Sequence, residues 1–380
     1  MKKILFRKFL IDYLTFFFMS LTAVSIIIWV FQSVNYLDII IEDGRDYLVY
    51  LKYCLYALPK IVSKLIPFAA FFSLSYIIVK YENNNELIIF WNFGVNKIIL
   101  INFFILIAFA LLIIQFFLTI FLVPKTQDLA RTLFRNSEVS FLENFIKEKK
   151  FNDIIKDLTI HTDSKNSKNI MNNIYLKRNF NGNENFEITY AKKGEFKTVG
   201  EVQILTLYNG ESISGNMKNL TNFNFSKTDI VLKDLSSDVM KVIKTQENSS
   251  KDLMICVLNL RQNNSKGLLL NKKINVQNCN LQNLKDIFRE LYKRVIAPTY
   301  IVVLILIASL LVMKSKENIG YNKFKILIFI LGFSILVFSE ISLRFINNSL
   351  EKNYYLILFP VLLFLSIYTY IRIINKFRKL

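Results

Sequence analysis

Six runs of about twenty apolar residues, almost free of charged side chains, constrain this chain of 380 residues more than any other feature. A helix of about 20 apolar residues crosses the roughly 30 Å hydrocarbon core of a bilayer, and it satisfies its own backbone polar groups there. The runs therefore predict an integral membrane protein with six transmembrane helices. Their approximate bounds are residues 9–31, 55–79, 98–123, 295–313, 326–345 and 354–374.

The stretch between the third and fourth runs has a different composition. Residues 124–290 are rich in Asn, Lys, Ser and Asp, and they contain short segments in which apolar and polar side chains alternate. Alternation with a period of two, interrupted by Asn, Gly and Ser, is typical of strands in an antiparallel sheet. The segments are 158–162, 173–179, 186–191, 202–215 and 223–232. The predicted plan is three spans in residues 1–123, a β domain in 124–290, and three further spans in 291–380.

The formal charge of +19 does not indicate a nucleic-acid-binding protein. The segment from Pro124 to Glu290 holds 26 Lys and Arg residues and 19 Asp and Glu residues, whereas a nucleic-acid-binding surface shows a stripe of one sign. The sequence also lacks the GxxxxGK[ST], GxSxG, HExxH and paired-Cys patterns of nucleotide, hydrolase and metal sites. Its single histidine, His161, does not make a metal site by itself. We therefore expect no cofactor and no enzyme activity in this chain.

The distribution of Lys and Arg predicts the orientation of the spans. Short cytoplasmic loops carry an excess of these residues, and four basic clusters fall on one side if the chain crosses the membrane six times. The clusters are Lys2, Lys3, Arg7 and Lys8; Lys80 and Lys97; Lys314, Lys316, Lys323 and Lys325; and Arg372, Lys376, Arg378 and Lys379. Both termini are then cytoplasmic, and the β domain lies on the opposite side. Cys256 and Cys279 share that side, and a disulfide between them requires it to be oxidising, so their pairing stays open.

The loop between the second and third spans, YENNNELIIFWNFGVNK (81–97), is longer than a tight turn requires. Its central part, at about 82–94, predicts a short amphipathic helix on the membrane surface, with an acidic first turn and a closing glycine. Such a helix either rests on lipid headgroups or docks on a soluble partner, and we favour docking. The docking residues are then Glu86, Leu87, Phe90, Trp91 and Gly94.

Several ionisable side chains lie inside or near the ends of the predicted spans, where a charge is costly unless it is paired or functional. Three pairs are each one helical turn apart: Lys60 and Lys64, Glu290 and Arg294, and Glu340 and Arg344. The two lysines either extend to lipid headgroups or contact an anionic substrate. The third pair either neutralises itself or lines a gate. The second pair, with Pro298 one turn further on, is predicted to fix the hinge between the β domain and the membrane.

This plan and several stretches resemble the lipopolysaccharide export permease family, LptF/LptG. The likeness lies in FQSVNYLDIIIEDG (31–44), LPKIVSKLIPFAAFFSLSYII (58–78), NNELIIFWNFGVNK (84–97) and FRELYKRVIAPTYIVVLILIASLLV (288–312). The third stretch resembles the coupling segment of the family, in which Glu-Leu precedes an apolar run, a Gly and a basic residue. The fourth resembles the LptF-type subunit more than the LptG-type. The likeness covers essentially the whole chain, although the β domain matches by its position more than by its residues.

The resemblance implies a permease subunit of an ABC-type exporter in the bacterial inner membrane, with a jelly-roll-like β domain in the periplasm. Its partners would be a cytoplasmic LptB-like ATPase dimer, an LptG-like second permease and a periplasmic bridge protein of the LptC/LptA type with a β-jelly-roll fold. The complex would extract lipopolysaccharide from the outer leaflet of the inner membrane and pass it to the bridge. ATP hydrolysis in the ATPase would drive this step through the coupling helix.

The resemblance also bears on the substrate contacts. In the family, basic residues near the outer end of the first span are implicated in substrate contact, whereas this chain has Ser33 and Asn35 there. Arg45, Lys60 and Lys64 are left as the candidates for that role, and Glu340 and Arg344 are candidates for the gate. Two alternatives stay open, a membrane-anchored periplasmic binding or sensor protein and an ABC permease for another lipid or lipoprotein. The coupling segment favours a permease, because a simple anchor has no need of it.

Overall fold

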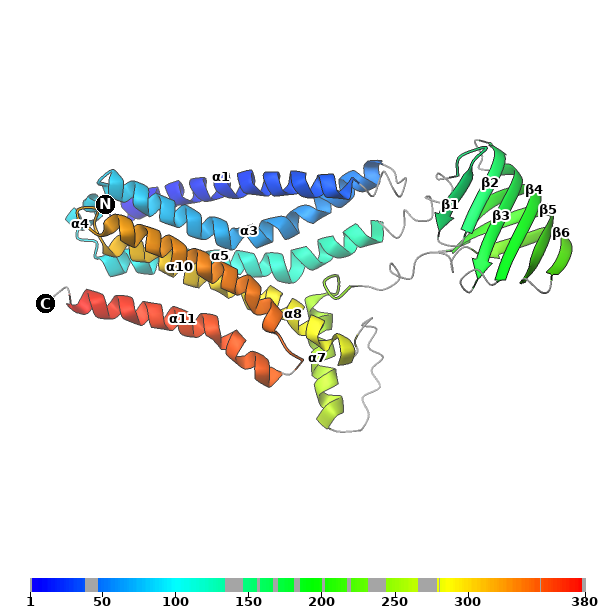
Figure 1. The fold of residues 1–380 in the computed structure, drawn as a ribbon. Coiled ribbons are helices and arrows are strands. Elements are labelled where there is room, and N and C mark those ends of the chain that lie inside the picture. The colour runs from blue at the N-terminus through cyan, green and yellow to red at the C-terminus, as the bar shows by residue number, and fades with distance from the viewer. Residues whose placement is uncertain are drawn as a thin grey trace. The chain divides into compact units, whose positions relative to one another are not determined.

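The computed structural model describes residues 2–37, 47–133, 146–155, 158–166, 170–180, 185–199, 202–216, 220–231, 244–265, 279, 281–348 and 350–377. The chain divides into two compact units. The first comprises Met1–Gln32, Tyr56–Asp128 and Ile243–Leu380, and it is helical. The second comprises Ser33–Leu55 and Leu129–Val242, and it contains the β-strands (Figure 1).

Six helical stretches in the described part of the chain are long and apolar enough to cross a membrane, and they confirm the six predicted spans. They are Lys2–Tyr36, Tyr47–Asn83, Lys97–Leu133, Leu284–Met313, Tyr321–Phe345 and Asn353–Asn375. The first three are much longer than the roughly 20 residues that a bilayer core requires. At 1.5 Å per residue each of the three is about 50 Å long, so each extends well beyond the hydrocarbon.

The spans differ in how regular they are. The first is α1 (Lys2–Tyr36) and the second is α3 (Tyr47–Asn83), and the short α4 (Glu86–Asn92) precedes the third. The third begins as α5 (Lys97–Phe117) and passes through a π-helical segment, Leu118–Leu122, into further helix up to residue 133. The fourth consists of α8 (Leu284–Val295), a 3-10 turn at Ala297–Thr299, α9 (Tyr300–Ser309) and a 3-10 turn at Leu310–Met313. The fifth is α10 (Tyr321–Ser342), which ends in a 3-10 turn at Leu343–Phe345, and the sixth is α11 (Leu350–Phe377).

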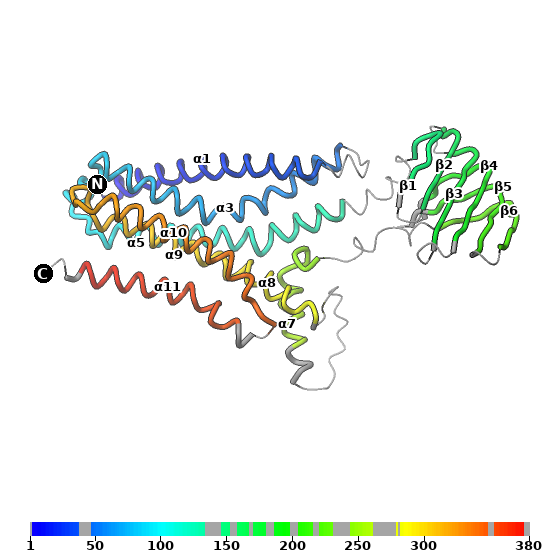
Figure 2. Tube along the Cα trace, in the orientation of Figure 1, coloured from blue at the N-terminus to red at the C-terminus, as the bar shows by residue number. Residues whose placement is uncertain are grey.

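Helix α9 is the centre of the first unit. All of its residues are buried, and it contacts α5, α10 and α11; Figure 2 traces these helices side by side. A helix that is apolar all round belongs in the interior of a bundle. The surrounding helices expose large apolar side chains outward, such as Ile113 of α5 and Ile330 of α10, which suits contact with lipid tails.

The second and fifth spans approach each other closely at a glycine. Gly332 of α10 is buried against the ring of Phe71 of α3, and a Cβ atom at position 332 would overlap that ring. Phe71 also makes an edge-to-face contact with Phe329, with 5.9 Å between the ring centroids. Small residues at such contacts allow membrane helices to pack closely.

The strands of the second unit form one antiparallel sheet in the order β1-β2-β3-β4-β5-β6. Their bounds are Phe151–Ile155, Leu158–Lys165, Ile170–Phe180, Asn185–Val199, Val202–Asn216 and Leu220–Val231. The five alternating segments of the sequence correspond to β2 to β6, so the predicted antiparallel insertion between the third and fourth spans is confirmed. Each described strand pairs with the next along the chain, without a crossover among them, and the jelly-roll character of the domain stays a prediction.

The two faces of the sheet differ as the alternation predicts. Leu158 and Ile160 of β2 and Leu205 and Leu207 of β5 are fully buried in one apolar cluster. Polar side chains dominate elsewhere; for example, Lys197 and the hydroxyl of Tyr208 both hydrogen-bond the carboxylate of Glu195. These two donors hold the pKa of the Glu195 carboxyl below its usual range.

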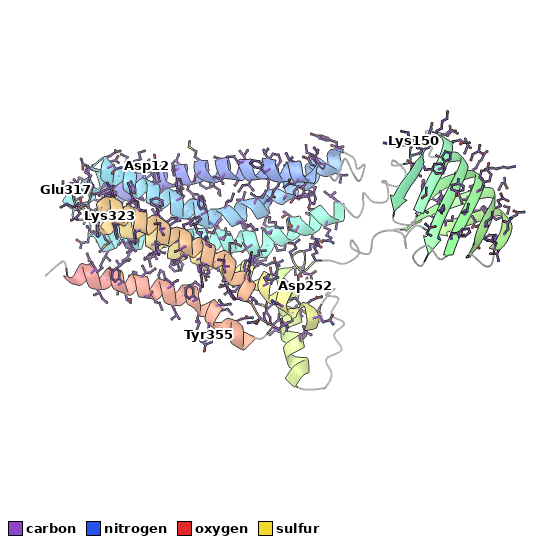
Figure 3. The ribbon with its side chains drawn as sticks, in the orientation of Figure 1. Asp12, Lys150, Asp252, Glu317, Lys323 and Tyr355 are labelled. Atoms are coloured by element: carbon purple, nitrogen blue, oxygen red, sulfur yellow. A yellow bond between two sulfur atoms is a disulfide. The ribbon has the colours of Figure 1, made fainter. Side chains whose placement is uncertain are left out.

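Helix α7 (Ser250–Ser265) lies in the stretch that the sequence assigns to the β domain, yet it belongs to the first unit. Leu253 and Cys256 of α7 are buried against Ile287 of α8, and a disulfide joins Cys256 to Cys279. The pairing that the sequence leaves open is therefore present in the structure. Figure 1 shows α7 running crosswise to the long helices of its unit, and Figure 3 labels Asp252 in its first turn.

Candidate functional site

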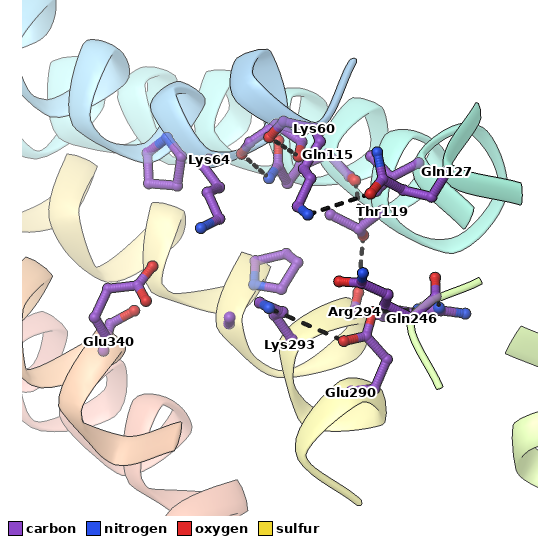
Figure 4. Close-up of a pocket in the computed structure, with 16 residues that line it drawn as sticks. Lys60, Lys64, Gln115, Thr119, Gln127, Gln246, Glu290, Lys293, Arg294 and Glu340 are labelled. Carbon is purple, nitrogen blue, oxygen red and sulfur yellow. Dashed lines mark hydrogen bonds and ion pairs between the residues drawn. The ribbon is translucent and has the colours of Figure 1, made fainter. Parts of the chain in front are cut away.

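A cavity of about 90 Å³ lies among the long helices of the first unit (Figure 4). Helix α8 supplies part of its lining, and α8 lies toward the end of the unit away from α4 (Figure 1). Residues of α3, the third span, α8 and α10 line it, together with Gln246 from the segment before α7. Its charged lining consists of the basic Lys60, Lys64, Lys293 and Arg294 and the acidic Glu290 and Glu340. The excess of basic groups suits an anionic ligand, because charge-assisted hydrogen bonds to phosphate or carboxylate are the strong ones.

The cavity brings together most of the charged residues that the sequence singles out. Lys60, Lys64, Glu290, Arg294, Pro298 and Glu340 all line it, although they come from three different spans. Arg344 is not part of the lining, and Arg45 lies outside the described residues. Sequence reasoning missed Lys293, whose Nζ atom lies 4.0 Å from the Glu290 carboxylate. Its position three residues after Glu290 was the available signal, since residues three apart share a helix face.

Arg294 holds the cavity wall together. Its side chain is buried, and its guanidinium donates hydrogen bonds to Glu290 Oε1 at 3.1 Å and to Ser250 Oγ at 2.9 Å. It also donates to the backbone carbonyls of Asn248 and Gln246, both at 2.9 Å. These bonds join α8 to the segment that leads into α7, and they occupy most of the five N–H donors of an arginine. Arg294 is thus placed to fix the wall, while the lysines have donors left for a ligand.

Lys60 and Lys64 lie one turn apart on the same face of α3, as the sequence predicts, and both reach the cavity. Lys60 Nζ donates to Gln127 Oε1 at 3.2 Å. Figure 4 shows Lys64 and Glu340 pointing toward each other across the cavity. The two lysines therefore face a polar space inside the unit rather than only the lipid headgroups.

The middle of the third span, where α5 passes into a π-helical segment, supplies the polar wall next to the lysines. Gln115 is almost fully buried, its Nε2 atom donates to the carbonyl of Ser63 at 2.6 Å, and its Oε1 atom has no hydrogen-bond partner among the described residues. The π-helical segment Leu118–Leu122 follows, and Thr119 Oγ1 donates to the carbonyl of Arg294 at 2.9 Å. Short π-helical segments occur frequently at functional sites. Gln115 is one of the residues that line the cavity.

Glu340 and Arg344 do not form an ion pair with each other in the described structure. The helix tightens into a 3-10 turn at Leu343–Phe345, so the spacing of four residues no longer stacks the two side chains on one face. Arg289 of α8 instead donates to the carbonyl of Leu343 at 3.2 Å. Of the two residues, Glu340 alone faces the cavity, and the gate role of both stays a prediction.

The predicted amphipathic helix between the second and third spans is present as α4 (Glu86–Asn92), at the opposite end of the unit. Gly94 ends it with a φ of 67°, a conformation that glycine adopts without strain. The N–H groups of Gly94 and Val95 bond the carbonyls of Trp91 at 2.9 Å and Phe90 at 3.0 Å, which is the Schellman arrangement of a helix end.

The side chains of α4 divide into an inner and an outer set. Leu87 and Phe90 are buried in the core of the unit, where Phe90 meets the rings of Phe6 and Phe9. The outer set comprises Ile88, Ile89 and Phe93, which are exposed, and the partly exposed carboxylate of Glu86. Leu87 and Phe90 therefore fix α4 to the spans, and the exposed apolar surface includes Ile88 and Ile89, which are not among the predicted docking residues.

Ionic and polar contacts fasten both halves of the chain together at the α4 end. Glu82 accepts a hydrogen bond from the backbone N–H of Lys316 at 2.7 Å, and Lys316 Nζ donates to the carbonyl of Asn83 at 3.0 Å. Lys97 Nζ donates to the carbonyl of Met313 at 3.1 Å and lies 5.7 Å from the centre of the Trp91 ring. Figure 3 labels Asp12, Glu317 and Lys323 at the same end. The ends of the two spans that flank α4 are therefore bonded to Met313 at the end of the fourth span and to Lys316 in the loop that follows it.

Comparison with known proteins places this chain beside a permease family and a bacterial relative. A sequence model of the family described as "Lipopolysaccharide export system permease LptF/LptG" matches residues 7–373. An uncharacterized protein of Rickettsia prowazekii (strain Madrid E) is 25% identical over 300 residues, which is 78% of this chain and 78% of the relative. The family match spans both units, from the first helix to the last.

Proposed function

The chain belongs to the LptF/LptG family of lipopolysaccharide export system permeases, and on that premise we propose that it is the LptF-type permease subunit of an inner-membrane exporter. In this family the permease does not hydrolyse ATP; that activity resides in a partner. The proposed partners are an LptB-like ATPase dimer, an LptG-like second permease and an LptC/LptA-like bridge protein. The F-type assignment is supported by the resemblance of residues 288–312 at the start of the fourth span.

We propose that the α4 end of the first unit faces the cytoplasm. The start of α1, the end of α11 and α4 lie together at this end (Figure 1), and the basic clusters of the sequence flank these segments. The positive-inside rule supports this orientation. The disulfide between Cys256 and Cys279 supports it as well, because disulfides persist in the periplasm and not in the cytoplasm.

The proposed substrate contact is the cavity near α8. Its basic side chains are the single observation that carries the proposal, since lipid A bears phosphate groups that Lys60, Lys64 and Lys293 would bind. Arg294 and Glu290 would keep the wall in place rather than contact the lipid, because they already bond each other.

The proposed contact with the ATPase is the outer face of α4. Glu86 is placed in its first turn, where a carboxylate is stabilised by the helix dipole. Its Oε1 atom accepts a hydrogen bond from Asn84 Nδ2 at 3.1 Å, and its Oε2 atom lies 3.9 Å from Lys8 Nζ. Ile88, Ile89 and Phe93 add apolar surface around it. Leu87, Phe90, Trp91 and Gly94 would transmit the movement of α4 to the spans.

A photo-crosslinking experiment tests the substrate contact. A photoreactive phenylalanine at position 339, next to Glu340 in the cavity lining, is introduced into the full complex in native membranes, and adducts are probed for lipopolysaccharide. A lipopolysaccharide adduct is expected, and Lys60→Gln with Lys64→Gln should reduce it about tenfold or more, because each charge-assisted bond contributes about 1.5–3 kcal/mol.

The matched control is Lys285→Gln on α8, whose exposed side chain is not part of the cavity lining. The control should leave the adduct unchanged. An adduct that is absent, or equally strong in the double variant, would contradict the cavity as the substrate site. An adduct with a different lipid would still support a permease function, but it would show that this other lipid is the substrate.

A further inference from the structure

The outer face of α7 carries an apolar stripe that nothing in the described structure covers. Leu253 and Cys256 are fully buried on the inner face, whereas Met254, Ile255 and Leu258 are 56%, 46% and 55% exposed. Successive residues of a helix are about 100° apart, so the three exposed side chains form a single stripe opposite to the inner face. An amphipathic helix with an apolar outer face is typical of the membrane interface.

The start of α7 is fixed rigidly to the spans. The Ser249 hydroxyl donates to Asp252 Oδ2 at 2.7 Å and accepts the Asp252 N–H at 3.2 Å, which caps the first turn. Ser250 Oγ donates to the carbonyl of Ile120 in the third span at 2.8 Å. Arg294 of α8 bonds Ser250 and the residues before it. The direction of α7 is therefore set by the third and fourth spans.

A second set of contacts fixes the middle of α7. The disulfide from Cys256 to Cys279 lies in a small apolar cluster with Leu253 and Ile287. Because α7 is fixed at its start and at its middle, it keeps its crosswise direction relative to the spans (Figure 1). A helix that crosses the spans at such an angle lies along the plane of the bilayer.

The depth of α7 corresponds to the headgroup layer. Its contact residue on α8, Ile287, precedes Val295, the start of the apolar run of the fourth span, by about two turns, which is about 12 Å along a helix. The headgroup layer extends about 5–8 Å beyond the hydrocarbon on each side. Since a helix has a radius of about 5 Å with its side chains, the side of α7 that faces the bilayer reaches this layer. The exposed Lys251 lies one turn before Ile255 and can extend to lipid phosphates.

We propose that α7 is an interfacial helix whose Met254, Ile255 and Leu258 insert into the lipid headgroup layer next to the cavity. The partner is the lipid surface itself, because α7 lies at the depth of the headgroup layer and its exposed side chains are apolar, like those that the spans of the same unit expose. This proposal rests on the chain spanning a membrane and not on the identity of the transported lipid. Through Arg294, α7 thereby links the cavity wall to the surrounding lipid.

Spin labelling of the full-length chain tests the proposal. Met254→Cys and Leu258→Cys are made separately in a Cys54→Ser background, leaving the native disulfide in place, and the labelled protein is reconstituted in vesicles of phosphatidylethanolamine and phosphatidylglycerol. Power-saturation measurements compare the accessibility of each label to oxygen, which concentrates in the bilayer, and to a water-soluble nickel chelate. Both labels should show a higher ratio of oxygen accessibility to nickel accessibility than the control Asn222→Cys, which is an exposed position on β6 and should favour nickel.

Two outcomes contradict the proposal. Labels at 254 and 258 that favour nickel as strongly as the control would place α7 in water. Labels that are sheltered from both reagents would show that protein, and not lipid, covers the stripe. An intact disulfide and an unchanged unfolding midpoint in the labelled variants establish that either result reports on the native fold.

Discussion

Replacing Arg294 with Ala is expected to destabilise the first unit by about 3–5 kcal/mol, the cost of removing one partner of a buried ion pair. Arg294 is 2% exposed, and its guanidinium bonds four oxygen atoms at 2.9–3.1 Å. Four bonds to a charged group would sum to more, at about 1.5–3 kcal/mol each. The net loss is smaller because Glu290 keeps the ammonium of Lys293 at 4.0 Å. Arg294→Lys retains the charge but cannot reach all four acceptors, and we expect about half of the loss.

Equilibrium unfolding in mixed micelles with increasing dodecyl sulfate measures this loss, and hydrogen exchange of residues 244–258 locates it. The matched control is Arg289→Ala on the same helix. The Arg289 side chain is 41% exposed, pairs with Asp286 at 3.1 Å and donates to the carbonyl of Leu343 at 3.2 Å, so its removal should cost no more than about 2 kcal/mol. A loss in Arg294→Ala no larger than in the control, with unchanged exchange in 244–258, would refute the reasoning.

Three further predictions concern helix contacts. Gly332→Val should lower the stability by about 1–3 kcal/mol in the same unfolding assay through overlap with Phe71, and Phe71→Ala should restore part of it; an additive loss in the double variant would contradict this contact. Gly94→Ala should lower the stability by about 1–2 kcal/mol because of the left-handed backbone conformation alone, since a Cβ atom at position 94 would have only Lys2 Nζ within 4 Å. Limited proteolysis should then cleave faster at α4, and an unchanged cleavage rate would contradict the strain. Glu82→Ala should raise the rate of hydrogen exchange in residues 314–320, because the N–H of Lys316 loses its acceptor, and should not change the exchange of α9. Unaltered exchange in residues 314–320 would mean that this hydrogen bond does not order the loop.

The elements that the sequence predicts correctly are those with a strong period or length. The spans follow from apolar runs longer than any soluble helix needs, and the five longer strands follow from alternation that a half-buried sheet imposes. The short β1 (Phe151–Ile155) has two adjacent isoleucines at its end and no clear alternation, so its pairing with β2 had no local signal.

The parts that escaped prediction depend on contacts between distant segments. The pattern of α7 is mixed, with apolar side chains on both its inner and its outer face, because protein covers one face and the other is exposed. The sequence of α4 does not indicate that Phe90 packs against Phe6 and Phe9, because these residues are more than eighty positions away in the chain. Likewise, the pairing of Glu290 with Arg294 could be predicted from spacing, but their meeting with Lys60 and Gln115 required the packed helices.

The burial of α9 has a consequence for how the protein is made. In the sequence the chain looks like two sets of three spans separated by a soluble insertion, which suggests two halves that mature in turn. In space, α9 of the second set fills the centre, packs on α5 of the first set, and shares one continuous core with α1 and α3. The first three spans therefore leave the ribosome without the helix that completes their interior. They must wait in the bilayer, with that surface open to lipid or to an insertion chaperone, until the whole soluble insertion has been synthesised and the fourth span arrives.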